Sequence, residues 1–261
     1  MPISTAEAPA RSAPIPAVEA DLLEVNRSFY DALWRDARLI PPQQFNTWPL
    51  VAELAANAPR RLELAPGLRP RLPIAGTAFA DISAPALRQL GAHGGLATQA
   101  LADALPYADD AFDLVCAFDI IEHIDGDEAA MAELARVAAP GATLLLSVPI
   151  HMAAWTAFDD FVGHRRRYEP EALLALLARH GFALQRSAAH GMQPKSTRLL
   201  KLGMWYLTHQ RERAMWWYNR VFMRLALGTQ PALSMSPGMI DTDDVDTVLL
   251  VCRRIGGAAS D

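Results

Sequence analysis

The chain has 261 residues, of which 51% are hydrophobic and 20% charged, and this balance excludes a disordered or fibrous protein. Its 24 basic and 29 acidic side chains leave a formal net charge of −5, which argues against a protein built mainly to bind nucleic acid phosphates. No basic patch and apolar stretch open the chain, and no run reaches the roughly 18 apolar residues that a membrane-spanning helix needs. We therefore expect a cytoplasmic protein without a transmembrane segment.

The N-terminal part of the chain precedes the predicted core. Residues 1–17 are rich in Ala and Pro, and we expect them to form a disordered lead. Residues 18–59 are predicted to form helices that cover the site. Apolar residues recur at helical spacing from Val18 to Arg38, and a second helix is predicted from Trp48 to Ala58.

Short apolar segments alternate with helical patterns through the rest of the chain. The predicted strands are Arg60–Ala65, Thr77–Ser83, Gly95–Ala100, Phe112–Ile121, Ala142–Pro149, Phe182–Ala188 and Asp246–Arg254. The predicted helices are Pro85–Leu90, closed by Gly91; Asp127–Ala139, stopped by Pro140 and Gly141; and Glu171–His180. This alternation predicts an α/β domain over residues 60–254, followed by a tail at 255–261, with a parallel sheet covered by helices on both faces.

Acidic residues stand at the carboxyl ends of several predicted strands, where open α/β sheets bind their ligands. The first strand ends in ELAPG from Glu63 to Gly67, the second in Asp81 and the third in Asp103. A carboxylate at the end of a second strand can accept hydrogen bonds from both hydroxyls of a ribose. Asp81 taken alone is better explained as a helix cap.

The segment Ala102–Ile124, with the sequence ADALPYADDAFDLVCAFDIIEHI, carries the most specific motif. With PGATLLLSVP at Pro140–Pro149 it resembles the adenine-binding and following segments of class I S-adenosylmethionine (SAM) dependent methyltransferases. The resemblance covers most of Arg60–Ala188. It implies a Rossmann-like, seven-stranded sheet, mostly parallel with an antiparallel last strand, and SAM as the cofactor. It therefore implies a methyltransferase.

The resemblance also implies roles for individual residues. Glu63 would lie near the methionine end of SAM, Asp81 would hold the ribose hydroxyls, and Asp103 would accept from the adenine amino group. The other implied cofactor positions are the backbone NH of Ala104 at an adenine ring nitrogen, Phe118 and Asp119 facing the methionine amino group, and Ile82, Ala65, Gly67 and Arg69.

The turn after the first strand departs from the family pattern. Its three usual glycine positions hold Ala65, Gly67 and Arg69, and the ten residues from Gly67 to Gly76 are too few for a normal helical crossover. The first helix is therefore predicted to be shortened or absent. Either Arg69 or Arg71 replaces the lost backbone donors by pairing with the methionine carboxylate, or the site is degenerate and no longer binds SAM.

Three histidines are candidates for a catalytic base beside the methyl donor. His123 follows the fourth predicted strand and His151 the fifth, while His164 lies in the polar loop Phe158–Pro170. The alternative for His123 is a capping or cofactor-facing role, and the arginine run Arg165–Arg167 can equally be a solvated turn. No group of His, Cys and carboxylate residues has the spacing of metal ligands, so we expect no metal.

An insertion at residues 192–241 separates the last two predicted strands and is predicted to form a helical cap rich in Trp and Met. It would line an acceptor pocket, pack as core, form a homodimer interface, or touch a membrane surface through its arginines. A pocket lining predicts a small-molecule acceptor that is apolar, aromatic or lipid-like, methylated on oxygen or nitrogen. The alternative is a methyltransferase fold that serves as a non-catalytic binding partner. A nicotinamide-dependent enzyme is disfavoured because G-x-G-x-x-G is absent.

Overall fold

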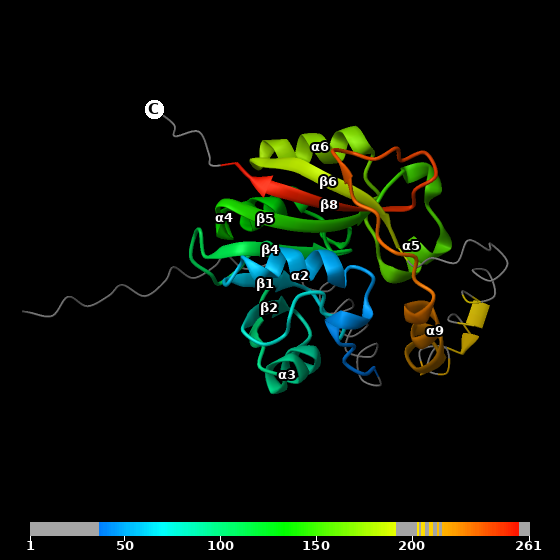
Figure 1. Ribbon diagram of the computed structural model, residues 1–261. Coiled ribbons are helices and arrows are strands. Elements are labelled where there is room, and N and C mark those ends of the chain that lie inside the picture. Colours follow the sequence, from blue (N-terminus) through cyan, green and yellow to red (C-terminus); the bar gives the residue numbers. More distant parts are fainter. Residues whose placement is uncertain are drawn as a thin grey trace, which may run out of the picture.

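In the computed structural model, residues 37–191, 203, 205–206, 209–210, 213 and 216–255 are described. The predicted lead, nearly all of the first predicted helix, much of the predicted cap and most of the tail lie outside the described residues. The described part contains a mixed sheet flanked by helices (Figure 1). The helices are α2 (Trp48–Ala56), α3 (Ala84–Ala92), α4 (Asp127–Val137), α5 (Ala157–Val162), α6 (Pro170–Arg179) and α9 (Met223–Gly228).

The sheet has eight strands in the order β3-β2-β1-β4-β5-β8-β6-β7. The strands are β1 (Arg61–Leu64), β2 (Thr77–Asp81), β3 (Leu96–Gln99), β4 (Phe112–Phe118), β5 (Ala138–Pro149), β6 (Phe182–His190), β7 (Ser236–Pro237) and β8 (Thr247–Arg254). β1 pairs in parallel with β2 and β4, and β8 pairs antiparallel with β5 and β6. The mostly parallel sheet with an antiparallel last long strand is therefore confirmed. The two-residue β7 at the edge was not predicted.

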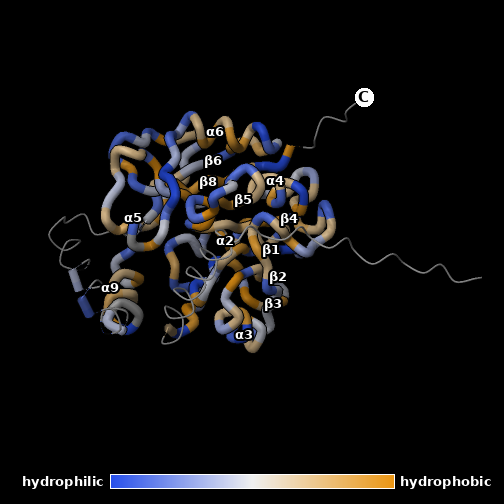
Figure 2. The backbone as a smooth tube through the Cα atoms, turned by 180° about the vertical axis from the view of Figure 1, so that it is seen from behind, coloured by the Kyte–Doolittle hydropathy of each residue, from blue (hydrophilic) through white to orange (hydrophobic). Residues whose placement is uncertain are grey.

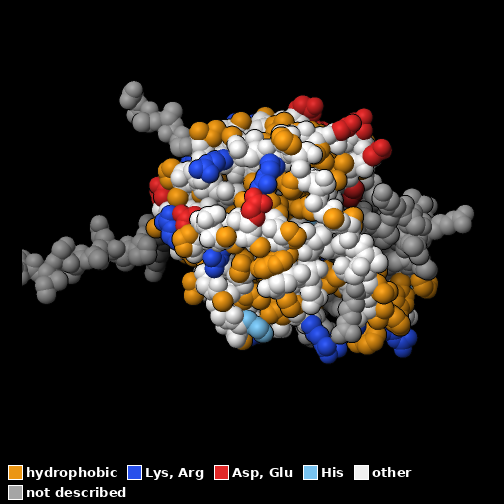
Figure 3. Space-filling view, in the orientation of Figure 1, with side chains coloured by type: hydrophobic (Ala, Val, Ile, Leu, Met, Phe, Trp, Pro, Cys, Tyr) orange, Lys and Arg blue, Asp and Glu red, His pale blue; other side chains and the backbone are white. Residues whose placement is uncertain are grey.

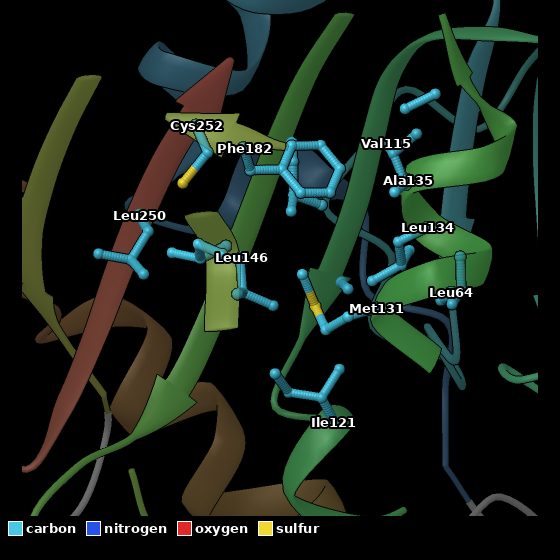
Figure 4. Close-up of a cluster of buried hydrophobic side chains, with 14 of the residues drawn as sticks. Leu64, Val115, Ile121, Met131, Leu134, Ala135, Leu146, Phe182, Leu250 and Cys252 are labelled. Carbon is cyan, nitrogen blue, oxygen red and sulfur yellow. The ribbon is translucent and has the colours of Figure 1, made fainter. Parts of the chain in front are cut away.

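Helices cover both faces of the sheet, and neighbouring residues of a strand point to opposite faces, so each strand contributes to two cores. In β4, Val115 belongs to the core under α4 and α6, whereas Leu114 and Cys116 pack with Leu50 and Val51 of α2. Figure 4 shows the first of these cores, with Met131 and Leu134 of α4 reaching toward Leu146 and Leu250 of the strands. Figure 2 shows the hydrophobic segments concentrated along the central strands.

Two predicted boundaries were wrong. Gly91 lies inside α3, which ends at Ala92, and the left-handed turn comes later at Gly94 with φ +88°. Pro140 and Gly141 do not stop α4, because the helix already ends at Val137 and these two residues lie in β5. There the pairing between β4 and β5 shifts register, so the missing NH of Pro140 costs no ladder hydrogen bond.

The connection between β1 and β2 contains no helix, as predicted from its length and its prolines. β4 is shorter than predicted: it ends at Phe118 and is followed by a 3-10 turn, η2 (Ile121–His123). The segment Phe158–Pro170, expected as one loop, includes most of α5. These three connections lie at the carboxyl ends of the parallel strands, and they carry the candidate site.

Candidate functional site

The Glu63 carboxylate organises the connection after β1. It is 1% exposed, and both of its oxygens accept backbone NH groups, at 2.8 and 3.1 Å from Arg71 and at 2.9 Å from Leu72. Burial raises the pKa of Glu63 to about 7, against these hydrogen bonds. The side chain therefore fixes the backbone at Arg71 and Leu72, in a connection that has no helix.

Asp81 connects the same turn to the end of β2. One carboxylate oxygen accepts the NH of Gly67 at 2.9 Å and the other accepts the NH of Ser83 at 2.8 Å. These two bonds tie the turn after β1 to the segment that follows β2. Ala65 and Gly67 reach this position with φ of +47° and +52°, in the left-handed region that the usual glycines would favour.

Arg71 is the buried cation of this region. Its guanidinium lies 3.7 Å from the ring centre of Phe45 and 5.2 Å from that of Phe118, and its Nη1 has no hydrogen-bond partner among the described residues. Burial lowers the pKa of Arg71, against the opposing charges of Asp119 and Glu63. A buried guanidinium with an unpartnered nitrogen is arranged to receive an anionic group from outside the protein.

Asp119 supplies a negative charge near this guanidinium. It follows β4 with φ of +49°, it is exposed, and one carboxylate oxygen accepts the Ser147 hydroxyl at 2.7 Å. Arg71 and Asp119 thus present a cation and an anion that attract each other. That pair matches a zwitterion, and the amino-acid end of SAM is one.

His190, at the end of β6, lies near Phe118 and was not among the residues predicted from the sequence. Its ring lies edge-to-face on Phe118, 5.5 Å between centres, and its Nδ1 is buried without a partner among the described residues. Burial lowers the pKa of His190 to about 4, against the charge of Asp119. The ring is therefore neutral at physiological pH, and one of its two nitrogens carries no proton. No motif surrounds His190, so only the fold could bring it to Phe118.

The predicted adenine positions lie in a turn beyond β3. Asp103 and Ala104 are exposed, and the Ala104 NH donates to the Leu101 carbonyl at 3.3 Å. Ile82 lies at the end of β2, where its carbonyl accepts the Gln99 side chain at 2.9 Å. Arg69 lies in the turn after β1 and its NH donates to the Pro66 carbonyl.

The three candidate base histidines separate into two places. His123 and His164 stack edge-to-face with 4.6 Å between ring centres, and the buried Glu122 lies 3.8 Å from His164 Nε2. Burial lowers the pKa of His123 to about 3 and also lowers that of His164. His151 lies elsewhere, and both of its ring nitrogens have partners, Glu169 and the Thr242 carbonyl.

The arginine run is held by internal ion pairs. Arg165 pairs with Asp125 at 3.1 Å and Arg166 with Asp127. Arg167 is buried, donates to both oxygens of Asp159 at 2.9 and 3.0 Å, and also pairs with an acid from beyond the cap, Asp246. These pairs fix the segment in place.

The described end of the predicted cap lies against the candidate site. The NH of Asn46 donates to Gln230 at 2.7 Å, and its side-chain amide donates to the Pro231 carbonyl at 2.9 Å. Leu233 and Met235 pack against the same core as Phe118. Figure 3 shows hydrophobic side chains gathered at the lower right, over α9. Leu225 of α9 is exposed, as are Phe222, Trp216 and Trp217 before it in the chain. No helix of the described residues is both long enough and apolar enough to cross a membrane.

Comparisons with known proteins agree with this arrangement. Residues 71–146 match the family model of a methyltransferase domain. A 47-residue stretch is 45% identical to ajmaline N-methyltransferase of Rauvolfia serpentina, but it covers only 18% of this chain and 16% of that enzyme.

Similar solved structures cover most of the chain. A SAM-dependent methyltransferase of Thermotoga maritima, a possible histamine N-methyltransferase, is 13% identical with a TM-score of 0.54, covering 90% of this chain and 93% of its own. The cyclase SpnF is 18% identical with a TM-score of 0.56, covering 89% and 96%. At these identities the likeness concerns the fold alone.

Proposed function

This chain contains a class I SAM-dependent methyltransferase domain, and on that premise we propose that it transfers the methyl group of SAM to an oxygen or nitrogen of a small, apolar, aromatic or lipid-like acceptor. The observation that carries the proposal is the unpartnered Nη1 of Arg71 beside Asp119 at the end of β4. In this assignment Arg71 binds the methionine carboxylate and Asp119 binds the ammonium group.

The remaining cofactor contacts are part of the same proposal. In this assignment Asp81, at the end of β2, binds the ribose hydroxyls, and Asp103, Ala104 and Ile82 line the adenine. Glu63, Ala65, Gly67 and Arg69 shape the turn below the methionine. Glu63 acts there through its hydrogen bonds to the loop, because it is buried and both of its oxygens accept NH groups of the loop.

Methyl transfer mainly requires that the acceptor atom be aligned with the methyl carbon and, for a hydroxyl, that its proton be removed. We assign proton acceptance to neutral His190 ahead of His123, His151 and His164, since its Nδ1 is unpartnered and its ring lies on Phe118. The cap residues 192–241 form the acceptor wall in this assignment. The described Leu233 and Met235, which pack against the same core as Phe118, support an apolar acceptor.

Methyl-labelled SAM tests the function. The full chain is incubated with labelled SAM and three acceptor pools: aromatic phenols and amines, long-chain alcohols and amines, and small sugars. We expect label in the first two pools and none in the sugars. Binding of SAM without transfer to any pool would favour the non-catalytic binding partner instead, and transfer to sugars alone would contradict an apolar acceptor.

The Arg71 assignment has its own test, by titration calorimetry with SAM. Arg71→Met removes a charge-assisted hydrogen bond, so we expect the Kd to rise about 10- to 100-fold. Arg71→Lys keeps the positive charge but lacks the planar guanidinium, so we expect its Kd for SAM to lie between those of the wild type and Arg71→Met. Arg186→Met, at an exposed ion pair with Glu53, is the matched control and should leave the Kd unchanged. Equal affinity of all four proteins would remove Arg71 from the site.

A further inference from the structure

Three potential metal ligands converge next to the candidate site. Glu122 and His123 belong to the turn η2 after β4, and His164 follows α5. One ligand atom from each lies within 4.8 Å of the others. Spacing along the chain could not indicate this group, because His164 comes from a different connection than the other two residues.

Glu122 is the observation that points to a ligand. Its side chain is 0% exposed, and neither carboxylate oxygen has a hydrogen-bond partner among the described residues. A buried carboxylate is normally paired or bound to a metal, because desolvation without compensation is unfavourable. The nearest donor, His164 Nε2, is 3.8 Å from Oε1, which is too far for a hydrogen bond. The two atoms thus face each other at a separation that a cation bound to both could bridge.

Hydrogen bonds from neighbouring groups orient the rings of His123 and His164, as is usual for histidines that bind a metal. His164 Nδ1 lies 2.8 Å from Asp159 Oδ1, so its Nε2 is directed toward Glu122. The ring of His123 has a hydrogen bond with the backbone of Gly163. A histidine that binds a metal typically donates its other ring NH to a carboxylate or a backbone carbonyl in this way. Asp159 is in turn fixed by Arg167 and by Thr156.

We propose that Glu122, His123 and His164 bind a divalent transition-metal ion of the Zn²⁺ class, with at least one coordination position left for water or for an acceptor heteroatom. Two imidazoles and one carboxylate suit Zn²⁺ and Fe²⁺, whereas Mg²⁺ and Ca²⁺ prefer oxygen ligands alone. Metal–ligand distances of about 2.0–2.2 Å require the three donor atoms to move closer together on binding. Only the role at an acceptor rests on the proposed function.

Metal binding is measured without SAM or acceptor, so its outcome is independent of methyl transfer. The full chain is stripped with a chelator, dialysed against Zn²⁺ and analysed for bound zinc, and Co²⁺ is added in parallel because its visible absorption reports coordination. We expect about one equivalent per chain for the wild type. Glu122→Gln and His164→Gln should weaken zinc binding at least about 10-fold and abolish the cobalt spectrum.

Two further variants separate binding from folding. His93→Gln changes an exposed histidine on the far connection after α3 and should bind zinc like the wild type. Asp159→Asn keeps all three ligands but loses the orienting carboxylate, and a 10- to 100-fold loss of affinity is expected, roughly as for other outer-shell partners. Circular dichroism checks that each variant is folded. Zinc binding that survives both Glu122→Gln and His164→Gln, or a wild type that binds no zinc, would overturn the proposal.

Discussion

At the scale of single residues, the candidate site depends on side chains with unusual burial. Glu63 and Arg71 are both buried, and each takes part in the short connection between β1 and β2. The sequence placed Glu63 and Asp81 correctly at their strand ends, because the strand pattern there is clear. The sequence left open whether Arg69 or Arg71 pairs with the methionine carboxylate. Only the structure shows that the Arg71 guanidinium lies over the rings of Phe45 and Phe118.

The raised pKa of Glu63 predicts a pH dependence of stability. The carboxyl has a pKa of about 7 when folded and 4.5 as its ordinary value, so folding favours the protonated form. Its contribution is therefore full below pH 4.5, is lost as the pH rises to about 7, and is constant above that. Relative to Glu63→Gln, which cannot ionise, the wild type should lose roughly 3 kcal/mol of unfolding free energy across this window.

Urea unfolding of both proteins across this pH range measures the effect. Glu53→Gln, at an exposed carboxyl on α2, shows the result of removing a surface charge. If the wild type and Glu63→Gln keep a constant difference from acid to neutral pH, burial does not control the ionisation of Glu63.

At the scale of elements, most strands and helices could be predicted because their hydrophobic periods are long and bounded by Gly and Pro. The end of β4 and the short helix α5 could not. β4 ends at Phe118 because Asp119 turns into the left-handed region, and the apolar Ile120 and Ile121 beyond it read as a continuation of the strand. Similarly, α5 is a helix of six residues, too short to show a period.

The short helix α5 is stabilised at its start by Thr156. The Thr156 hydroxyl accepts the Phe158 NH, and Asp159 accepts the Thr156 NH at 2.7 Å, which together form a capping box. Thr156→Ala is expected to lower the unfolding free energy by about 1 kcal/mol. Thr229→Ala is the control, because its exposed hydroxyl bonds back to the Leu225 carbonyl and caps no helix start. An equal loss in both variants in thermal unfolding would argue against the cap.

At the scale of the whole molecule, the parallel α/β class could be predicted from the alternation of elements, but the order of strands could not. The last long strand, β8, lies between β5 and β6 and is antiparallel to both. Its side chains contact both faces: Leu250 belongs to the core with α4, and Leu249 to the core with α2. Residues distant in sequence thus complete each core.

A substitution at Leu250 tests the central position of β8 between β5 and β6. It is 0% exposed and pairs with Leu146 of β5 and Ser187 of β6. Leu250→Ala removes buried methyl groups and leaves a cavity, so we expect a loss of about 2–5 kcal/mol in urea unfolding. Leu225→Ala on α9, where the side chain is 64% exposed, should change stability by less than about 0.5 kcal/mol. A loss of similar size at both sites would contradict the central burial of β8.

The central position of β8 also bears on how the chain is made. Synthesis proceeds from the N-terminus, so β6 leaves the ribosome before β8 and finds no neighbour on the outer edge of β5. Until residues 247–254 follow, that edge of β5, with Leu144, Leu146 and Val148, is open to other strands. The open edge of β5 therefore favours aggregation of the nascent chain during the time taken to translate the connection from β6 to β8.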